Sequence, residues 1–215
     1  TAIYKTIEQY LAKKTTAIIA ISESQKKELS TVYHICQPEK IHIIPLGFDL
    51  ERFQVNQESK RHEFRNRYGV ARDEIAIGII GRLVPIKDHS FFLKAFRKVL
   101  DKTNTKVKAF IIGDGEERLN IESMARQLNI PFINSLNSAI NAPLVFTSWI
   151  KEIDVALAGL DIVALTSKNE GTPVSLIEAQ AANKPIVSTI SGGIENTVKS
   201  GVTALLSKNG DVDTF

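Results

Sequence analysis

Short apolar runs alternate along the chain with longer stretches that repeat apolar residues at helical spacing. The short runs are rich in β-branched residues and have the length of strands that are buried on both faces. Eight of them predict strands, at residues 17–21, 41–44, 75–80, 107–112, 144–146, 162–165, 185–188 and 204–206. Repeated alternation of strand and helix is typical of a doubly wound parallel sheet, so the predicted fold class is α/β.

Helices are predicted between these strands. Residues 89–100 place aromatic and aliphatic side chains on one face, and Asp88 directly before them can cap the first turn. Residues 116–128 show a second helical pattern. Residues 134–143 are polar with little periodicity and predict a loop.

The charged and amide-rich segment 54–72 interrupts this pattern and predicts a helix or linker between two parts. Residues 1–53 hold only two predicted strands, too few for a core of their own, whereas residues 73–215 hold six and can form a domain. The chain starts with Thr1 rather than Met, and residues 211–215 resemble the approach to another helix. We therefore expect a piece of a longer protein.

Composition limits the possible partners and compartment. The 215 residues include 27 basic and 24 acidic side chains, a net charge of +3 that is too small to indicate a nucleic-acid partner. No apolar stretch reaches the length of a membrane span, and the basic pairs at 13–14 and 26–27 allow only peripheral contact with the inner face of a membrane. The single cysteine, Cys36, excludes an intrachain disulfide, so we expect a cytoplasmic protein.

Glycines occur where the predicted strands end. In an open parallel sheet, ligands bind beyond the carboxyl ends of the strands, where glycine lets the backbone approach them closely. Tight turns are the alternative explanation for any one of these residues, which are Gly81, Gly113, Gly115, Gly171, Gly192 and Gly193. The pattern 113–115 lacks the third glycine of a dinucleotide fingerprint, which argues against a nicotinamide cofactor.

The run 170–179 carries two carboxylates, Glu170 in a Gly/Pro turn and Glu178 within an apolar helical pattern. We predict a helix over 172–182, with Thr172 as the capping residue and Pro173 in the first helical position. The start of a helix attracts phosphate, and carboxylates bind sugar hydroxyls. The run therefore suggests a site for a sugar nucleotide.

Two cations are predicted at the same edge of the sheet. Arg82 follows Gly81 directly, and Lys87 lies five residues later, just before a helix. A departing diphosphate needs such positive charge, although both could also be ordinary surface residues. Likewise, Glu178 must be hydrogen-bonded or paired if buried, by ribose, backbone amides or a basic side chain, and Glu170 could serve only the helix dipole.

No metal site and no nucleophile–base pair is predicted. Asp211 and Asp213 form an Asp-x-Asp pattern close to the last residue, where chance explains it best. The four histidines show no ligand spacing.

Taken in order, these blocks resemble the C-terminal half of a retaining glycosyltransferase of family 4, which has the GT-B architecture. The resemblance runs from about residue 16 to the end. It rests on the segments 17–24 and 41–53, Gly81-Arg82-Leu83 with Lys87, Gly113-Asp114-Gly115, the E-x7-E pattern from Glu170 to Glu178, and Gly192-Gly193. The implied fold is a Rossmann-like donor-binding domain with a strand–helix remnant of the N-terminal domain.

The resemblance also implies roles for individual residues. Arg82 and Lys87 would bind the donor diphosphate, Glu170 would hold the transferred sugar and assist catalysis, and Glu178 would bind the ribose. The remaining donor contacts would come from Gly81, Gly113, Trp149 and Ile150 near the nucleobase, and from Gly171, Thr172, Pro173, Val174 and Ser175, among which Pro173 has no amide to offer.

The donor implied is a nucleotide diphosphate sugar, most simply a UDP-sugar, used without a cofactor or metal. The acceptor would be a glycan, a lipid-linked molecule or a small molecule, bound by an N-terminal domain of which residues 1–29 are the last strand–helix unit. The fragment alone would then be inactive. The family's Gly-Gly-x-Pro-Glu is replaced by 192–196 without proline, so Glu195 receives no role. A sugar-nucleotide epimerase of GT-B fold and a non-catalytic nucleotide-sugar binding module are the alternatives.

Overall fold

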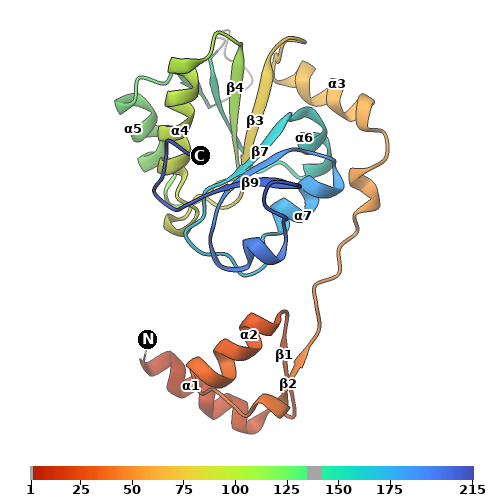
Figure 1. The fold of residues 1–215 in the computed structure, drawn as a ribbon, viewed down its shortest axis with the longest axis vertical. Coiled ribbons are helices and arrows are strands. Elements are labelled where there is room, and N and C mark those ends of the chain that lie inside the picture. The colour runs from red at the N-terminus through yellow and green to blue at the C-terminus, as the bar shows by residue number, and fades with distance from the viewer. Residues whose placement is uncertain (1, 135–141) are drawn as a thin grey trace. The chain divides into compact units, whose positions relative to one another are not determined.

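The computed structural model describes residues 2–134 and 142–215 of the chain. They belong to two compact units, Thr1–Asp49 and Leu50–Phe215, which are considered separately (Figure 1). Residues 135–141 of the predicted polar loop lie outside the described part.

In its described residues, the smaller unit contains two α-helices, a π-helical turn (Glu28–Val32), a 3-10 turn (Pro38–Lys40) and a pair of parallel strands. Its elements are α1 (Ala2–Lys14), β1 (Ile18–Ala20), α2 (Glu23–Lys27) and β2 (Ile41–Ile43). Ile18 lies opposite Ile41 in the strand pair. The Ser22 hydroxyl caps α2 by accepting the Gln25 amide at 3.1 Å, and Lys40 Nζ donates to the Ala12 carbonyl at 2.6 Å. Both predicted strands of this segment are therefore present, each shorter than its apolar run.

The larger unit is built on a seven-stranded sheet in which all neighbours run parallel, in the order β5-β6-β4-β3-β7-β8-β9. The strands are β3 (Ile75–Ile80), β4 (Val107–Ile112), β5 (Phe132–Ile133), β6 (Leu144–Ser148), β7 (Ile162–Leu165), β8 (Ile186–Thr189) and β9 (Ala204–Ser207). The predicted α/β class and parallel sheet are confirmed. The short edge strand β5 was not predicted, since two residues show no periodicity.

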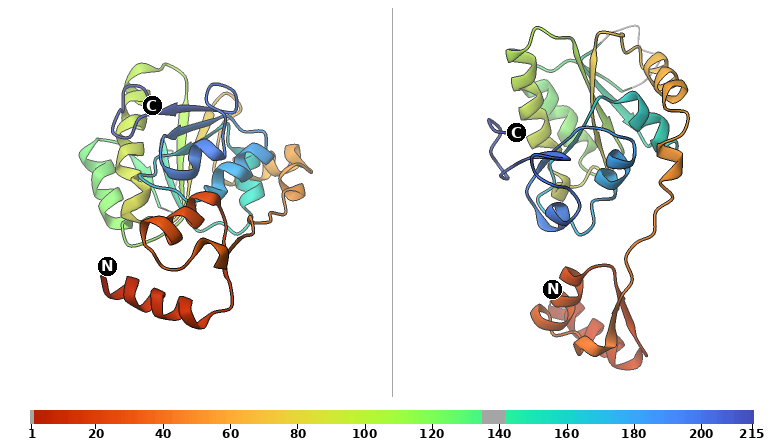
Figure 2. Two further views of the ribbon diagram at one scale, coloured as in Figure 1. Left: turned by 60° about the horizontal axis from the view of Figure 1, so that its bottom comes forward. Right: turned by 45° about the vertical axis from the view of Figure 1, so that its right-hand side comes forward.

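Helices cover both faces of this sheet. Figures 1 and 2 show α4 (His89–Lys102) and α5 (Arg118–Gln127) on one face. On the other lie α3 (Gln57–Arg67), α6 (Ile153–Gly159) and α7 (Val174–Ala181). Alternate residues of each strand feed two apolar layers: Phe110 and Ile112 join the layer with α3, α6 and α7, and Ile111 joins the layer with α4 and α5.

The Asp88 carboxylate caps α4 as predicted, accepting the Phe91 amide at 3.3 Å. No helix of the described ranges 2–134 and 142–215 combines the length and apolar character needed to cross a membrane.

The order of the strands reverses at β3. The chain first places β4, β5 and β6 on one side of β3, with β5 at the edge, and then places β7, β8 and β9 on the opposite side. The helix that follows β3 and the helix that follows β7 consequently cover opposite faces of the sheet. In such a sheet a crevice opens between two strands at their carboxyl ends, and it is the usual place for a ligand.

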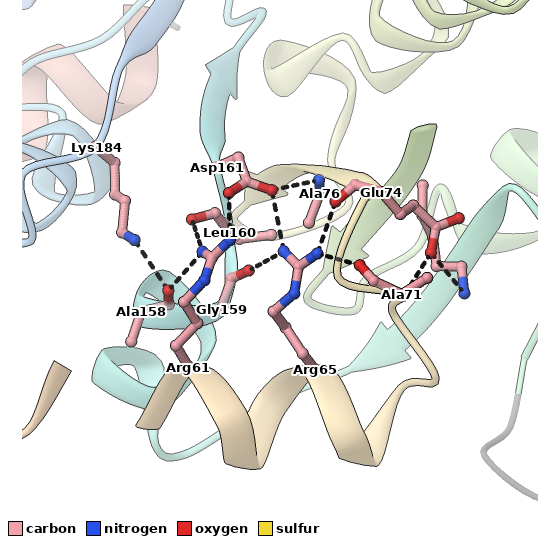
Figure 3. Close-up of polar contacts among 11 residues, drawn as sticks. Arg61, Arg65, Ala71, Glu74, Ala76, Ala158, Gly159, Leu160, Asp161 and Lys184 are labelled. Carbon is pink, nitrogen blue, oxygen red and sulfur yellow. Dashed lines mark hydrogen bonds and ion pairs between the residues drawn. The ribbon is translucent and has the colours of Figure 1, made fainter. Parts of the chain in front are cut away.

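At the amino ends of β3 and β7, a largely buried polar cluster fastens α3 to the sheet (Figure 3). The Arg65 guanidinium donates to Asp161 Oδ2 at 3.0 Å and to the carbonyls of Ala71 and Glu74 at 2.5 and 2.6 Å. Arg61 binds the other Asp161 oxygen at 2.7 Å. Asp161 Oδ2 also accepts the Ala76 amide at 2.8 Å. Burial opposes ionisation of Asp161, but this amide and the guanidiniums hold its pKa below the usual value.

Replacing Arg65 should therefore destabilise the larger unit strongly. R65A removes one of the two guanidiniums that bind Asp161 and the side-chain donor to the Ala71 and Glu74 carbonyls, and we expect a loss of about 3 kcal/mol in the free energy of unfolding. R67A is the matched control, because Arg67 lies on the same helix and makes only an exposed pair with Glu63. It should cost at most about 0.5 kcal/mol. Urea denaturation at pH 7 measures both, and equal losses would contradict the anchoring role.

Candidate functional site

Two loops at the carboxyl edge of the sheet are tied to each other, the one after β3 and the one after β7. The Lys168 amide donates to the Ile86 carbonyl at 2.8 Å. The buried Thr166 hydroxyl reaches the carbonyls of Lys87 and Asp88 at 2.9 and 3.0 Å. Lys168 Nζ lies 3.1 Å from Asp88 Oδ2. These contacts fix the position of each loop against the other.

The junction brings Lys87 and Glu170 together. Lys87 Nζ donates to Glu170 Oε1 at 2.5 Å, and the Ser167 hydroxyl donates to the same oxygen at 2.5 Å. The Glu170 side chain is 10% exposed, so its charge is held by these partners rather than by water. Two residues that the sequence predicted at one edge of the sheet thus form an ion pair.

Gly192 and Gly193, which follow β8, pack against the loop that carries Glu170 and Gly171. The Gly193 amide donates to the Glu170 carbonyl at 2.7 Å, and a Cβ on Gly193 would lie 1.7 Å from the Gly171 carbonyl oxygen. Gly192 has φ +52°, and a Cβ there would lie 2.1 Å from the Glu170 carbonyl oxygen. Only glycine permits such an approach. The pair therefore determines where the backbone of Glu170 and Gly171 lies.

Helix α7 begins at Val174, one residue after the predicted first helical position, Pro173. The predicted capping by Thr172 is therefore wrong. Pro173 has ψ 85°, which is not helical, and it occupies the capping position without a side-chain hydrogen bond. Its carbonyl accepts the Leu176 and Ile177 amides. The amides of residues 171, 172, 174 and 175 donate to no other residue in the described part of the chain. They present the positive end of α7 at the crevice.

Arg82 lies at the same edge and is exposed, and its guanidinium binds no other described residue. Gly81, before it, is packed against Gly113 at the end of the next strand, where a Cβ on Gly113 would lie 1.9 Å from the Gly81 carbonyl oxygen. Close packing of the two strand ends leaves the arginine side chain to project from the edge. Among the described residues, this edge thus carries the paired cations Lys87 and Lys168 and one cation without a protein partner, Arg82.

Glu178 does not have the partner expected for a buried carboxylate. It is half-buried on α7, and its carboxylate makes no hydrogen bond or ion pair with the described residues. Partial exposure to water explains why an unpaired carboxylate is tolerated here. Burial nevertheless raises its pKa, and the charge of Arg52 offsets part of that rise.

Trp149 and Ile150 follow β6, beside the end of β4. The Gly113 amide donates to the Ser148 carbonyl at 3.0 Å, and Ser148 has φ +56°. The Arg118 guanidinium lies 3.4 Å from the Ser148 hydroxyl. Trp149 is 58% exposed, whereas Ile150 packs against the core. The indole is therefore available to a ligand at this corner of the sheet.

His89, the first residue of α4, is buried at 2% exposure, and neither ring nitrogen has a hydrogen-bond partner. Burial, with a further contribution from the charge of Lys87, lowers its pKa to about 4. Its ring is consequently neutral at physiological pH.

Other features of the larger unit are separate from this edge. A hollow of about 1100 Å³ between α4 and β7–β9 is lined largely by apolar side chains, and none of the predicted site residues lines it. Asp211 accepts the Thr214 hydroxyl at 2.6 Å and Asp213 pairs with Lys98. Among residues 2–134 and 142–215, no three His, Cys, Asp or Glu side chains are grouped as metal ligands.

The hydroxyl residues behind the site were not singled out from the sequence. Thr166 and Ser167 bind the loop and Glu170, while Thr189 and Ser191 donate to the Ser167 carbonyl at 2.9 and 2.8 Å. All four are buried. The available signal was the presence of hydroxyl residues directly after uninterrupted apolar strands, where burial requires that they bind something.

Comparison with known proteins identifies the family of the chain. The family described as "Glycosyl transferases group 1" matches residues 60–215, and the family described as "Glycosyltransferase Family 4" matches residues 1–52. The chain is 29% identical, over 99% of its length and 52% of the relative's, to UDP-Gal:alpha-D-GlcNAc-diphosphoundecaprenol alpha-1,3-galactosyltransferase of Escherichia coli. It spans about half the length of the curated relatives that it matches.

Solved structures show the same fold. The protein HepE of Anabaena, crystallised with UDP and glucose, superimposes with a TM-score of 0.78 at 23% identity, covering 97% of this chain and 54% of HepE. The C-terminal domain of a group 1 glycosyltransferase of Francisella tularensis gives a TM-score of 0.59 at 22% identity, covering 77% of this chain and 82% of that domain. The larger unit therefore has the fold of a GT-B C-terminal domain.

Because burial lowers the pKa of His89, the dependence of the unfolding free energy on acid pH tests that burial. Unfolded chains bind a proton at histidine below about pH 6.5, whereas the folded protein does so only near pH 4. Stability should fall as pH drops through this window, by about 3 kcal/mol in total. H89L should lose this component, while H62A, which removes an exposed histidine from α3, should keep it. Urea denaturation between pH 7 and 4 measures the difference, and parallel profiles for wild type and H89L would contradict it.

Proposed function

Because the chain belongs to the group 1 glycosyltransferases, we propose that its larger unit binds a nucleotide diphosphate sugar at the carboxyl edge of β3 and β7. The observation that carries this proposal is the Lys87–Glu170 pair, set beside the free amides at the start of α7. Residues 73–215 would form the donor-binding domain, with 54–72 as its connecting helix and 1–53 as the end of an acceptor-binding domain.

The diphosphate would bind where positive charge gathers. Arg82 supplies a guanidinium without a protein partner, Lys87 supplies an ammonium, and α7 supplies the amides of 171, 172, 174 and 175. Guanidinium groups and helix starts are the standard protein ligands for phosphate oxygens. The same groups would stabilise the negative charge of the departing diphosphate, which supports transfer without a metal ion.

The sugar and the nucleoside would lie on either side of the diphosphate. Glu170, oriented by Ser167 and Lys87, would accept hydrogen bonds from the hydroxyls of the transferred sugar. The Glu178 carboxylate, which has no partner among the described residues, would accept hydrogen bonds from the ribose hydroxyls. Trp149 and Ile150 would border the nucleobase, for which the exposed indole offers a stacking surface.

UDP is the nucleotide best supported. The names of the Escherichia coli relative and of the HepE crystals refer to a UDP-sugar or UDP. In the complete enzyme we propose that the sugar passes to an acceptor hydroxyl with retention of anomeric configuration. The acceptor would be bound by the remainder of the N-terminal domain.

Calorimetric titration of the chain with UDP, GDP and ADP, in EDTA and with Mg²⁺, tests the donor site directly. We expect UDP to bind without metal and R82A to weaken it by about tenfold, equivalent to about 1.4 kcal/mol. R72A is the matched control, since Arg72 is an exposed arginine without a partner at the amino end of β3. Absence of binding by all three nucleotides, or equal losses in R82A and R72A, would contradict the assignment.

The glycine support of the loop gives a second test. G193A places a methyl group against the Gly171 carbonyl and must displace residues 170–171, so UDP affinity should fall by about tenfold or more. G47A is its control, because nothing lies within 4 Å of a Cβ at that position. Unchanged UDP affinity in a folded G193A protein would show that the loop position does not matter for binding.

A further inference from the structure

Strand β6 ends irregularly at Ser148, the residue before Trp149. The register between β4 and β6 shifts there by one residue, so that Ile112 lies opposite Ser148. Ser148 has φ +56°, a conformation that residues other than glycine keep only where surrounding contacts hold them. Its carbonyl accepts the Gly113 amide at 3.0 Å and the Thr147 hydroxyl at 2.9 Å. The direction in which the exposed Trp149 leaves the sheet therefore depends on how this turn is held.

Arg118, the first residue of α5, contacts the turn with its side chain. Its Nη1 donates to the Ser148 hydroxyl at 3.4 Å. Its guanidinium also lies over the Phe146 ring, 4.6 Å from the centroid. Phe146 is the last fully buried residue of β6. One planar group thus contacts both the end of the buried strand and the residue that turns the chain toward Trp149.

The Arg118 side chain is itself held by Glu122. Arg118 Nε donates to Glu122 Oε1 at 2.6 Å, and the two side chains are 15% and 9% exposed. The same oxygen accepts Asn134 Nδ2 at 3.1 Å, from the residue that follows the edge strand β5. Exposed pairs four residues apart on a helix contribute little to structure, but this pair is largely buried and joined to a second element. The guanidinium is therefore presented to Ser148 in a fixed direction.

We propose that Arg118 is a positioning residue for the donor, which holds the turn at Ser148 so that Trp149 presents its indole to the nucleobase. This rests on the proposed function, and it does not require Arg118 to contact the donor. An aromatic surface that is already ordered loses less conformational entropy when a base stacks on it. Arg118 should therefore affect the affinity for a nucleotide but not the affinity for its diphosphate alone.

Trp149 is the only tryptophan of the chain, so its fluorescence reports on this corner alone. In the ligand-free protein, R118Q and S148A should lower the anisotropy of the indole emission, because the turn is then less restrained. S148A leaves the pair of Arg118 with Glu122 intact, so it tests the contact without disturbing α5. R126Q is the matched control, because Arg126 lies 3.6 Å from the other Glu122 oxygen but packs over a ring of β5 instead of β6. It should leave the anisotropy unchanged.

Calorimetry with UDP and with pyrophosphate separates the base from the diphosphate. R118Q should weaken UDP by about fivefold and pyrophosphate by less than about twofold, and S148A should show a smaller loss of the same kind. R118Q combined with S148A should be no weaker than R118Q alone, because the arginine acts through the serine. R126Q should bind both ligands as wild type does.

Two results would overturn the inference. One is that R118Q matches R126Q in indole anisotropy or in UDP affinity. The other is an equal loss for UDP and pyrophosphate in R118Q, which would indicate a general structural role. Failure of the donor site looks different, because wild type would then bind neither ligand, and the inference would fall with it. If wild type binds UDP no more tightly than pyrophosphate, the diphosphate site stands and the role of Arg118 and Trp149 falls.

Discussion

The candidate site depends on the pairing of β3 with β7, two strands that lie about 80 residues apart in sequence and side by side in the sheet. Their loops are joined at the carboxyl end by Thr166, Lys168 and the Lys87–Glu170 pair. At the amino end, Asp161 accepts the Ala76 amide and its own amide donates to the Ala76 carbonyl at 2.8 Å. Because both ends are fastened, neither strand can slide without breaking buried polar contacts, and the spacing of the site residues is fixed.

The two fastenings differ in their chemistry. At the amino end, Asp161 is satisfied by two guanidiniums and an amide, which suits a structural anchor. At the carboxyl end, the Glu170 carboxylate accepts hydrogen bonds from the Lys87 ammonium and the Ser167 hydroxyl. Arg82 and four backbone amides there have no partner among the described residues. At the amino end the hydrogen-bond donors are paired with protein acceptors, whereas at the carboxyl end the unpaired donors are available to a ligand.

Much of the fold follows from local pattern, whereas the site's contacts do not. Strands β3, β4 and β7 have the predicted bounds, because buried parallel strands need largely apolar runs, which Lys108 alone interrupts in β4. That strand ends gather Gly81, Arg82 and Glu170 at one edge follows from parallel topology. The ion pair of Lys87 with Glu170, and the support from Gly193, depend on which strands become neighbours, and that is decided by packing across the sheet. The start of α7 was mispredicted because Pro173 fits both a capping and a first helical position.

The position of these groups within one compact unit has a consequence for how function is divided. From Arg82 to Glu178, every residue proposed to bind the donor belongs to Leu50–Phe215. The proposed donor site therefore needs residues of this unit alone, with the diphosphate proposed at the start of α7 and the ribose at Glu178. Transfer needs an acceptor as well, and the relatives that carry it out are about twice as long as this chain. Under the proposed function, binding of the donor and transfer of the sugar are thus separable properties, and the residues proposed for the first lie in the larger unit.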